Sequence, residues 1–256
     1  PTYISPKNNN PSFFSGLLAG SVGWGDACII VPYEMYRRYG DARILSENYE
    51  MMKKWYVFLE ERAKKRPVNP VKRFKRNPYR RYTIETGVDY GEWCEPDVDS
   101  TSAMRTPQGK VATAFFAYSG RMLAEIAAIL GKEDDAAYYS KTAEMAKKAW
   151  RFIATEDGKI SSDRQADYVR ALAFGLLDGD EARQAAADLN ELVKKCGYHL
   201  NTGFLSTQNL TRVLCDYGYE DTAYKLLLQD TRPGWLYEVK KGATTIWETW
   251  DGINEK

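Results

Sequence analysis

From Val111 to Leu228 the sequence alternates helix-length segments with short turns, and this alternation constrains the fold more than any other feature. Helices are predicted over residues 111–130, 134–153, 165–177, 181–195, 204–217 and 219–228, and glycines stand in most of the intervening turns. Amphipathic helices joined by short turns pack against their neighbours as antiparallel pairs. The pattern therefore predicts an all-α chain, and no repeat of tetratricopeptide type is present.

The first third of the chain adds two predicted helices. Pro32 opens a short helix that Gly40 ends, and Asp41 caps the next one. That next helix has one apolar face, made by residues at alternating spacings of four and three: Leu45, Tyr49, Met52, Tyr56 and Leu59. With about eight helices in all, the chain fits a single domain over residues 1–256, an α/α barrel or toroid with a small β-hairpin predicted within residues 234–250.

Two long loops interrupt the helices. The basic run Lys64–Arg81 favours a solvated loop over a phosphate-binding arm, because blocks of like charge are usually solvated. The acidic stretch Thr83–Ser102 has no helical period, and long ordered loops are often functional. The 36 basic and 35 acidic residues balance, so no nucleic-acid partner is expected.

Cysteine, histidine and hydropathy patterns exclude several classes of protein. The four cysteines are scattered without CxxC spacing and are predicted to be free thiols, and His199 is the sole histidine. We therefore expect no zinc site, no other metal site and no cofactor. A calcium loop in the acidic stretch would lack the glycine that EF-hand spacing requires. No apolar run approaches the roughly 20 residues of a membrane span, so no membrane partner is expected.

The strongest candidate site is the stretch GATTIWETWDG, where Glu248 lies between Trp247 and Trp250. Two indoles could keep a carboxylate poorly hydrated, which would raise its pKa and prepare it for proton transfer. The rings could also stack on a sugar. The alternative is a hairpin whose glutamate points to solvent.

Two earlier segments repeat the combination of tryptophan and carboxylate. In GWGDA, Trp24 precedes Asp26, which either belongs to a site or caps the following helix. In YGEW, Trp93 follows Glu92 within a run of four carboxylates, three of which would ordinarily be solvated. His199 is kept as a weak candidate that supports the site, although a packed histidine is the commoner case.

Several stretches in one order (GWGDA, YGEW, TGF and WLYEVKKGATTIWETWDG) resemble the catalytic domain of the bacterial α-L-rhamnosidases of glycoside hydrolase family 78. The resemblance extends from about Gly23 to Gly252. It implies an (α/α)6 six-hairpin barrel and inverting hydrolysis of terminal α-L-rhamnose, so the expected partner is a rhamnose-containing glycoside.

The resemblance also implies roles for individual residues. Glu248 would be the general base, and Trp24 and Trp93 would be walls of the rhamnose pocket. From the chemistry of the side chains, we expect Asp26 to hold sugar hydroxyls through charge-assisted hydrogen bonds. We expect Trp247, Trp250 and Trp93 to exclude water and to stack on the ring. Glu92 stands where the family usually has aspartate, which leaves its role open.

The family's general acid lies in a motif that has no match in these 256 residues. We therefore expect the chain to be a segment that lacks barrel helices at both ends. We expect it to turn over slowly or not at all alone, and to self-associate through exposed apolar helix faces. The competing hypotheses are another six-hairpin hydrolase or lyase that acts on uronic acids, and a non-catalytic carbohydrate-binding barrel.

Overall fold

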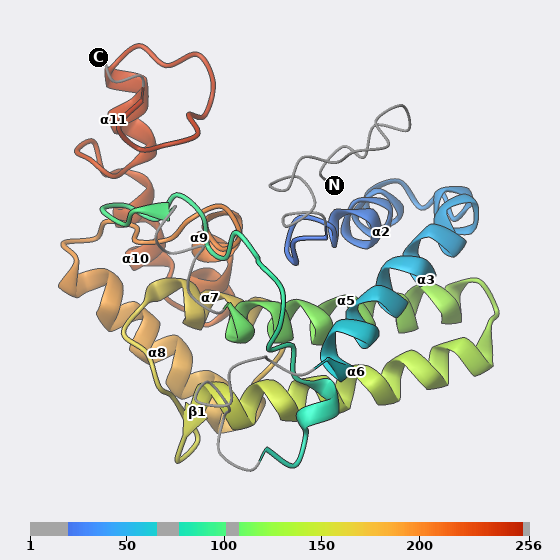
Figure 1. Cartoon of the computed structure of the whole chain (residues 1–256). Helices are drawn as coiled ribbons and strands as arrows, with labels where there is room; N and C mark the ends of the chain where they lie inside the picture. Colours follow the sequence, from blue (N-terminus) through green and yellow to red (C-terminus); the bar gives the residue numbers. More distant parts are fainter. Residues whose placement is uncertain (1–19, 66–76, 101–107, 253–256) are drawn as a thin grey trace. The chain divides into compact units, whose positions relative to one another are not determined.

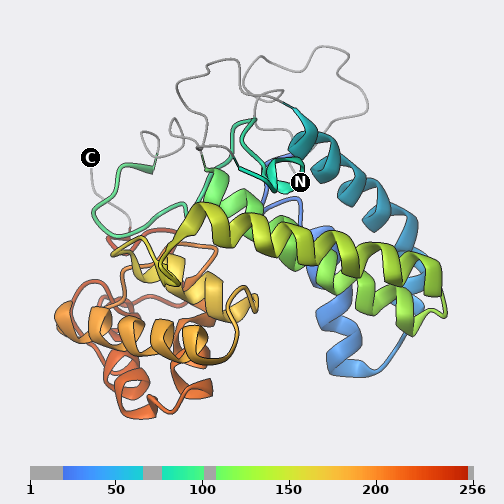
Figure 2. The same cartoon turned by 90° about the horizontal axis from the view of Figure 1, so that it is seen from below.

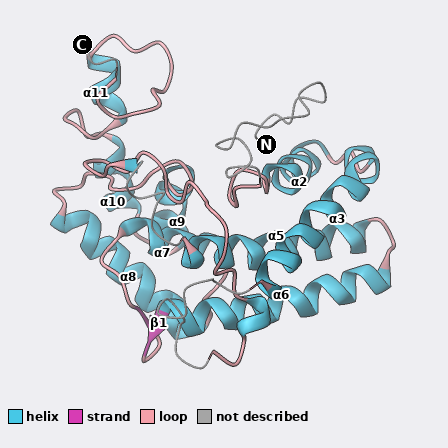
Figure 3. Ribbon diagram, viewed as in Figure 1, coloured by secondary structure: helices cyan, strands magenta, loops and turns pink. Residues whose placement is uncertain are grey.

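The computed structural model describes residues 20–65, 77–100 and 108–252. Most of the loop predicted for residues 1–26 and much of the basic run lie outside these ranges. The described chain is helical apart from one short hairpin and the loops (Figures 1 and 3). It divides into two compact units: Pro1–Gly91 with Met104–Ala154, and Glu92–Ala103 with Thr155–Lys256. We call them unit 1 and unit 2.

Unit 1 contains two helical pairs, α2 with α3 and α5 with α6 (Figure 2). Helix α2 spans Ala27–Tyr39, α3 spans Arg43–Lys64, α5 spans Gly109–Ile129 and α6 spans Glu133–Ala154, with a short 3₁₀ helix, η2, at Arg80–Tyr82. The five apolar residues predicted on one face of α3 are all buried, so that prediction is confirmed. Buried alanines at every third position of α6 (Ala143, Ala146 and Ala149) suit close packing against another helix.

The start of α2 differs from the prediction. The helix begins at Ala27 and not at Pro32, which lies inside it. Gly40 ends it as predicted, with φ +70° and its N–H donated to the Tyr36 carbonyl. Asp41 accepts the N–H of Arg43, the first residue of α3, at 2.9 Å. The sequence thus predicted the carboxyl end of α2 at Gly40 correctly, but its predicted start at Pro32 was wrong.

Unit 2 contains two further helical pairs and a short last helix. Helix α7 spans Gln165–Ala173, α8 spans Gly179–Lys195, α9 spans Thr207–Asp216, α10 spans Glu220–Leu227 and α11 spans Trp235–Lys240. Strands β1 (Thr155–Glu156) and β2 (Lys159–Ile160) form one antiparallel hairpin.

The predicted small hairpin therefore exists, but its predicted place near the carboxyl end was wrong. Residues 235–240 are helical and residues 241–252 form turns. Over so few residues, alternating apolar and β-branched side chains do not separate a strand from a helical turn. None of the helices in the described ranges combines the length and apolarity needed to cross a bilayer.

Candidate active site

The loop that carries Trp24 is fixed within unit 1 by a buried ion pair. Arg62 and Asp89 form a two-pronged salt bridge with both contacts at 2.9 Å. Asp89 also accepts the N–H of Val22 at 2.8 Å, and Arg62 donates to the Gly20 carbonyl at 3.2 Å. The Trp24 ring packs against Tyr90 at a centroid distance of 4.8 Å. These contacts order the loop on either side of Trp24.

Asp26 is completely buried at the start of α2. Its carboxylate accepts hydrogen bonds from Ser119 Oγ at 2.5 Å, Gly23 N at 2.7 Å and Trp55 Nε1 at 3.0 Å. Burial raises the pKa of Asp26, and these three donors oppose the shift. Because the side chain makes no cap bond to α2, the alternative that Asp26 caps this helix is wrong. A direct contact with sugar stays a prediction.

Glu92 is the centre of a buried polar cluster in unit 2. Its carboxylate pairs with Arg170 of α7 and accepts Ser206 Oγ at 2.9 Å and Gly203 N at 3.1 Å. Burial raises the pKa of Glu92 to about 7, although the Arg170 charge opposes this. Arg170 also pairs with Asp167. The cluster ties the acidic loop to α7 and to the start of α9.

The rest of the acidic loop corrects a sequence expectation. Three of its four carboxylates were expected to be solvated. Glu92 and Glu95 are both buried, and only Asp97 and Asp99 are exposed. Glu95 accepts Arg164 Nε at 3.2 Å, and the exposed Asp97 accepts Arg232 Nη1 at 2.9 Å. Within the described residues no cluster of three or more histidine, cysteine or acidic side chains is arranged to hold a metal ion, and all four cysteines are free, as predicted.

Trp93 is half-buried and its backbone is fixed by a very close approach. A Cβ added to Gly203 would lie 1.6 Å from the Glu92 carbonyl oxygen and 2.2 Å from that of Trp93. Phe204 donates its N–H to the Trp93 carbonyl at 3.0 Å. The TGF stretch thus packs closely against the backbone that carries Trp93.

Glu248 is exposed, so the poorly hydrated pocket expected from its two flanking indoles is not formed around it in this structure. Its position relative to Trp93 is nonetheless constrained. The pKa of the Cys94 thiol is raised first by burial and then by the charge of Glu248. The Glu248 carboxylate therefore lies within electrostatic range of the residue that follows Trp93.

The flanking indoles contact other groups of unit 2. Trp250 meets Trp235 edge to face at a centroid distance of 6.0 Å. Trp247 donates its backbone N–H to Glu238 Oε2 at 3.3 Å, and its ring packs over Gly252. Both indoles are half-buried, so they hold the turn in place and leave the glutamate between them open to solvent.

His199 uses both ring nitrogens in local contacts. Nδ1 lies 3.1 Å from the Cys196 carbonyl and Nε2 lies 2.8 Å from Thr231 Oγ1. A carbonyl can only accept, so Nδ1 carries a proton and donates it to the Cys196 carbonyl. His199 is thus a packed histidine that braces the residue before Arg232.

Sequence reasoning missed four charged residues that organise these segments: Arg62, Arg170, Arg232 and Glu238. Arg62 and Arg170 could have been found, because each interrupts an apolar helix face and a buried arginine needs a partner. Arg232 pairs with Asp97 and Asp251, which are distant in sequence, so no local signal identifies it.

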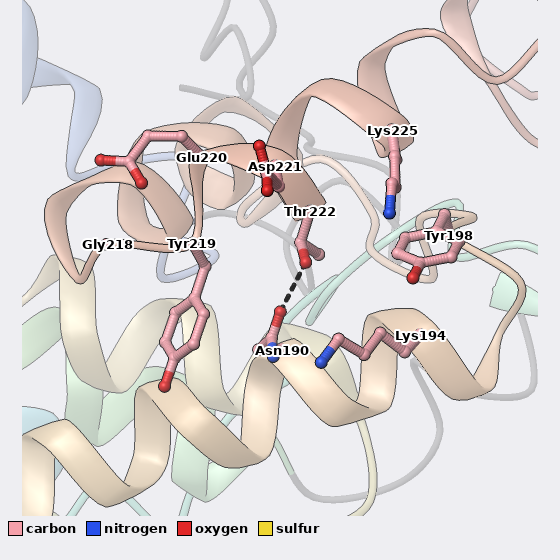
Figure 4. A pocket seen from close by; sticks show the side chains of 9 residues that line it. All are labelled: Asn190, Lys194, Tyr198, Gly218, Tyr219, Glu220, Asp221, Thr222 and Lys225. Atoms are coloured by element: carbon pink, nitrogen blue, oxygen red, sulfur yellow. Dashed lines mark hydrogen bonds between the residues drawn. The ribbon is translucent and has the colours of Figure 1, made fainter.

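A separate cavity of about 520 Å³ lies beside α8 and α10 in unit 2 (Figure 4). Thr222 donates to Asn190 across its floor at 2.6 Å. Lys194 at its edge pairs with Glu191, and Lys225 lies 5.0 Å above the Tyr198 ring. None of the residues predicted for the site lines this cavity.

Comparison with known proteins agrees with this combination of helical pairs and tryptophan-carboxylate loops. The model of the bacterial alpha-L-rhamnosidase 6 hairpin glycosidase domain matches residues 2–256. An alpha-L-rhamnosidase of Formosa agariphila is 35% identical over 238 residues, which are 92% of this chain and 24% of the relative. One of Streptomyces avermitilis is 37% identical over 237 residues, which are 91% of this chain and 20% of the relative.

Solved structures of alpha-L-rhamnosidases are also similar to this chain. The Streptomyces avermitilis alpha-L-rhamnosidase complexed with L-rhamnose superposes with a TM-score of 0.76 at 33% identity, over 92% of this chain and 21% of that one. The Aspergillus terreus enzyme gives a TM-score of 0.75 at 29% identity, over 91% and 26%.

These matches define the chain as a helical domain of the six-hairpin glycosidase class. It belongs to the bacterial α-L-rhamnosidase six-hairpin glycosidase domain family, as the sequence motifs implied. The chain spans about a fifth to a quarter of the length of the curated relatives it matches.

Proposed function

We propose that the enzyme carrying this chain releases terminal α-L-rhamnose from rhamnosides with inversion, and that Glu248 is its general base. Family membership supports the reaction class, and the similar enzyme of Streptomyces avermitilis was solved with L-rhamnose. The observation that carries the assignment is that the charge of Glu248 lies within electrostatic range of Cys94, the residue after Trp93. An exposed carboxylate there can reach a water on one face of a sugar stacked on Trp93.

Inversion requires two carboxyl groups about 6.5–9.5 Å apart, with a water between the base and the sugar. The base removes a proton from that water while the acid protonates the leaving oxygen. In this proposal Glu248 activates the water, and the acid comes from outside the motifs present here. Trp93 contributes a ring face beside Glu248 within unit 2. Within unit 1, the three protein donors to the Asp26 carboxylate hold the loop that carries Trp24.

The first test is Glu248→Gln in the complete enzyme, assayed on an aryl α-L-rhamnoside. Loss of a general base lowers turnover by about 10²- to 10⁴-fold, and we expect kcat to fall by that factor with little change in KM. Glu220→Gln, a charge change at an exposed site, is the matched control. A kcat within twofold of wild type for Glu248→Gln would remove Glu248 from the mechanism.

The stereochemistry and the missing acid are tested separately. Proton NMR of early product should show β-L-rhamnose before mutarotation, whereas α-L-rhamnose would contradict inversion. The 256-residue chain alone should cleave the same substrate slowly or not at all. Brisk turnover by that chain would place a general acid within it.

A further inference from the structure

Glu238 of α11 is a buried carboxyl with one oxygen that has no partner. The side chain is 3% exposed, and Oε1 makes no hydrogen bond within the described residues. Burial raises its pKa, and no cationic side chain opposes the shift. Such a group is costly to keep, so its presence calls for a reason.

The other oxygen identifies that reason. Glu238 Oε2 accepts the backbone N–H of Trp247, the residue immediately before Glu248, at 3.3 Å. The backbone carbonyl of Glu238 also accepts the Ala243 N–H at 3.0 Å. One residue therefore binds the segment Ala243–Gly252, which we call the base loop, at two points.

The residues that follow Glu248 in the base loop are also held by contacts. Arg232 binds Asp251 through two nitrogens, and Trp235 packs edge-on against Trp250. Glu248 is exposed, and its side chain forms no hydrogen bond or ion pair with another described residue. Its position must then come from the backbone on each side, and on the amino side that backbone is held by Glu238.

We propose that Glu238 is a positioning residue that sets the place of Glu248 through the Trp247 amide. This rests on the proposed role of Glu248 as the base. Because a misplacement of about 1 Å can cost about 100-fold in rate, the effect of Glu238 should be large on kcat and small on KM.

The test is a double-mutant cycle in the complete enzyme. Glu238→Leu removes the acceptor and should lower kcat by about 10- to 100-fold, whereas Glu238→Gln keeps a carbonyl acceptor and should recover much of the loss. In a Glu248→Gln background, Glu238→Leu should change the residual rate by less than about twofold, because no base is left to position. Glu220→Gln is the control.

Several outcomes overturn the proposal. Glu238→Leu lowering the rate by equal factors in both backgrounds would show a general structural role, and an unchanged kcat would show none. If Glu248→Gln alone is fully active, the proposed function fails instead.

A measurement without any substitution covers the case of a variant that does not fold. In the 256-residue chain, the Trp247 amide should exchange with solvent far more slowly than the amides of the exposed Ile246 and Thr249. Equal exchange at all three positions would contradict the proposed hydrogen bond.

Discussion

At the scale of single residues, Glu92 shows most clearly how burial changes the pKa of a side chain in this chain. Its folded pKa of about 7 lies above the ordinary value of 4.5, because burial disfavours the charged form. The native state therefore binds more protons than the unfolded state between these values. This contribution to stability is complete below about pH 4.5 and is lost as the pH rises through about 7.

We expect the free energy of unfolding of the wild-type chain to fall between about pH 5 and pH 7.5. Glu92→Gln cannot titrate, so its urea-denaturation midpoint should depend less on pH over the same interval. Parallel pH profiles for the two proteins would show that Glu92 is ionised in the folded state throughout.

Residue-level prediction from sequence succeeded where a pattern was local. The tryptophan-carboxylate stretches stand out by composition alone, but the partners of those carboxylates do not. Glu92 contacts Arg170, Gly203 and Ser206, which are all distant from it in the sequence. Only the fold shows which acidic groups are paired and which, like Glu248, stay in solvent.

At the scale of elements, helix periodicity was the dependable signal. The buried stripe of α3 and the positions of α5, α6 and α8 follow from apolar spacing and flanking turn residues. The start of α2 and the helix α11 were missed, because a proline inside a helix and a segment of six residues give weak or misleading local signals.

The crossing of α3 and α5 offers a test of that packing. A Cβ at Gly120 would lie 2.2 Å from the hydroxyl oxygen of Tyr56, which is buried and has no hydrogen-bond partner in the described residues. Gly120→Ala should therefore destabilise unit 1 by about 1–3 kcal/mol through overpacking.

Removing the hydroxyl should relieve part of that clash. Tyr56→Phe alone should be close to neutral, since no hydrogen bond is lost, and Gly120→Ala should cost less in its presence. Thermal or urea unfolding of the four proteins measures the coupling. Strictly additive losses would show that the two side chains do not meet.

At the scale of the whole molecule, exposed apolar side chains lie at helical spacing on α2. Val31, Met35 and Tyr39 are 56%, 42% and 75% exposed and recur every four residues. Large exposed apolar patches favour association, which is the physical basis for the self-association expected from sequence.

We expect the 256-residue chain to form concentration-dependent oligomers in sedimentation velocity. Met35→Lys with Tyr39→Lys should shift the distribution toward monomer without lowering helicity. Arg37→Gln, a charge change at an exposed position on another face of the same helix, is the control. A chain that stays monomeric at every concentration would contradict self-association through Val31, Met35 and Tyr39.

The contact at Gly203 also limits which substitutions this chain can accept. The carbonyl oxygens of Glu92 and Trp93 lie so close to Gly203 that no side chain fits there without displacing the peptide that carries Trp93. A library designed to test the proposed sugar recognition should leave position 203 untouched and vary Phe204 instead, whose side chain is 43% exposed.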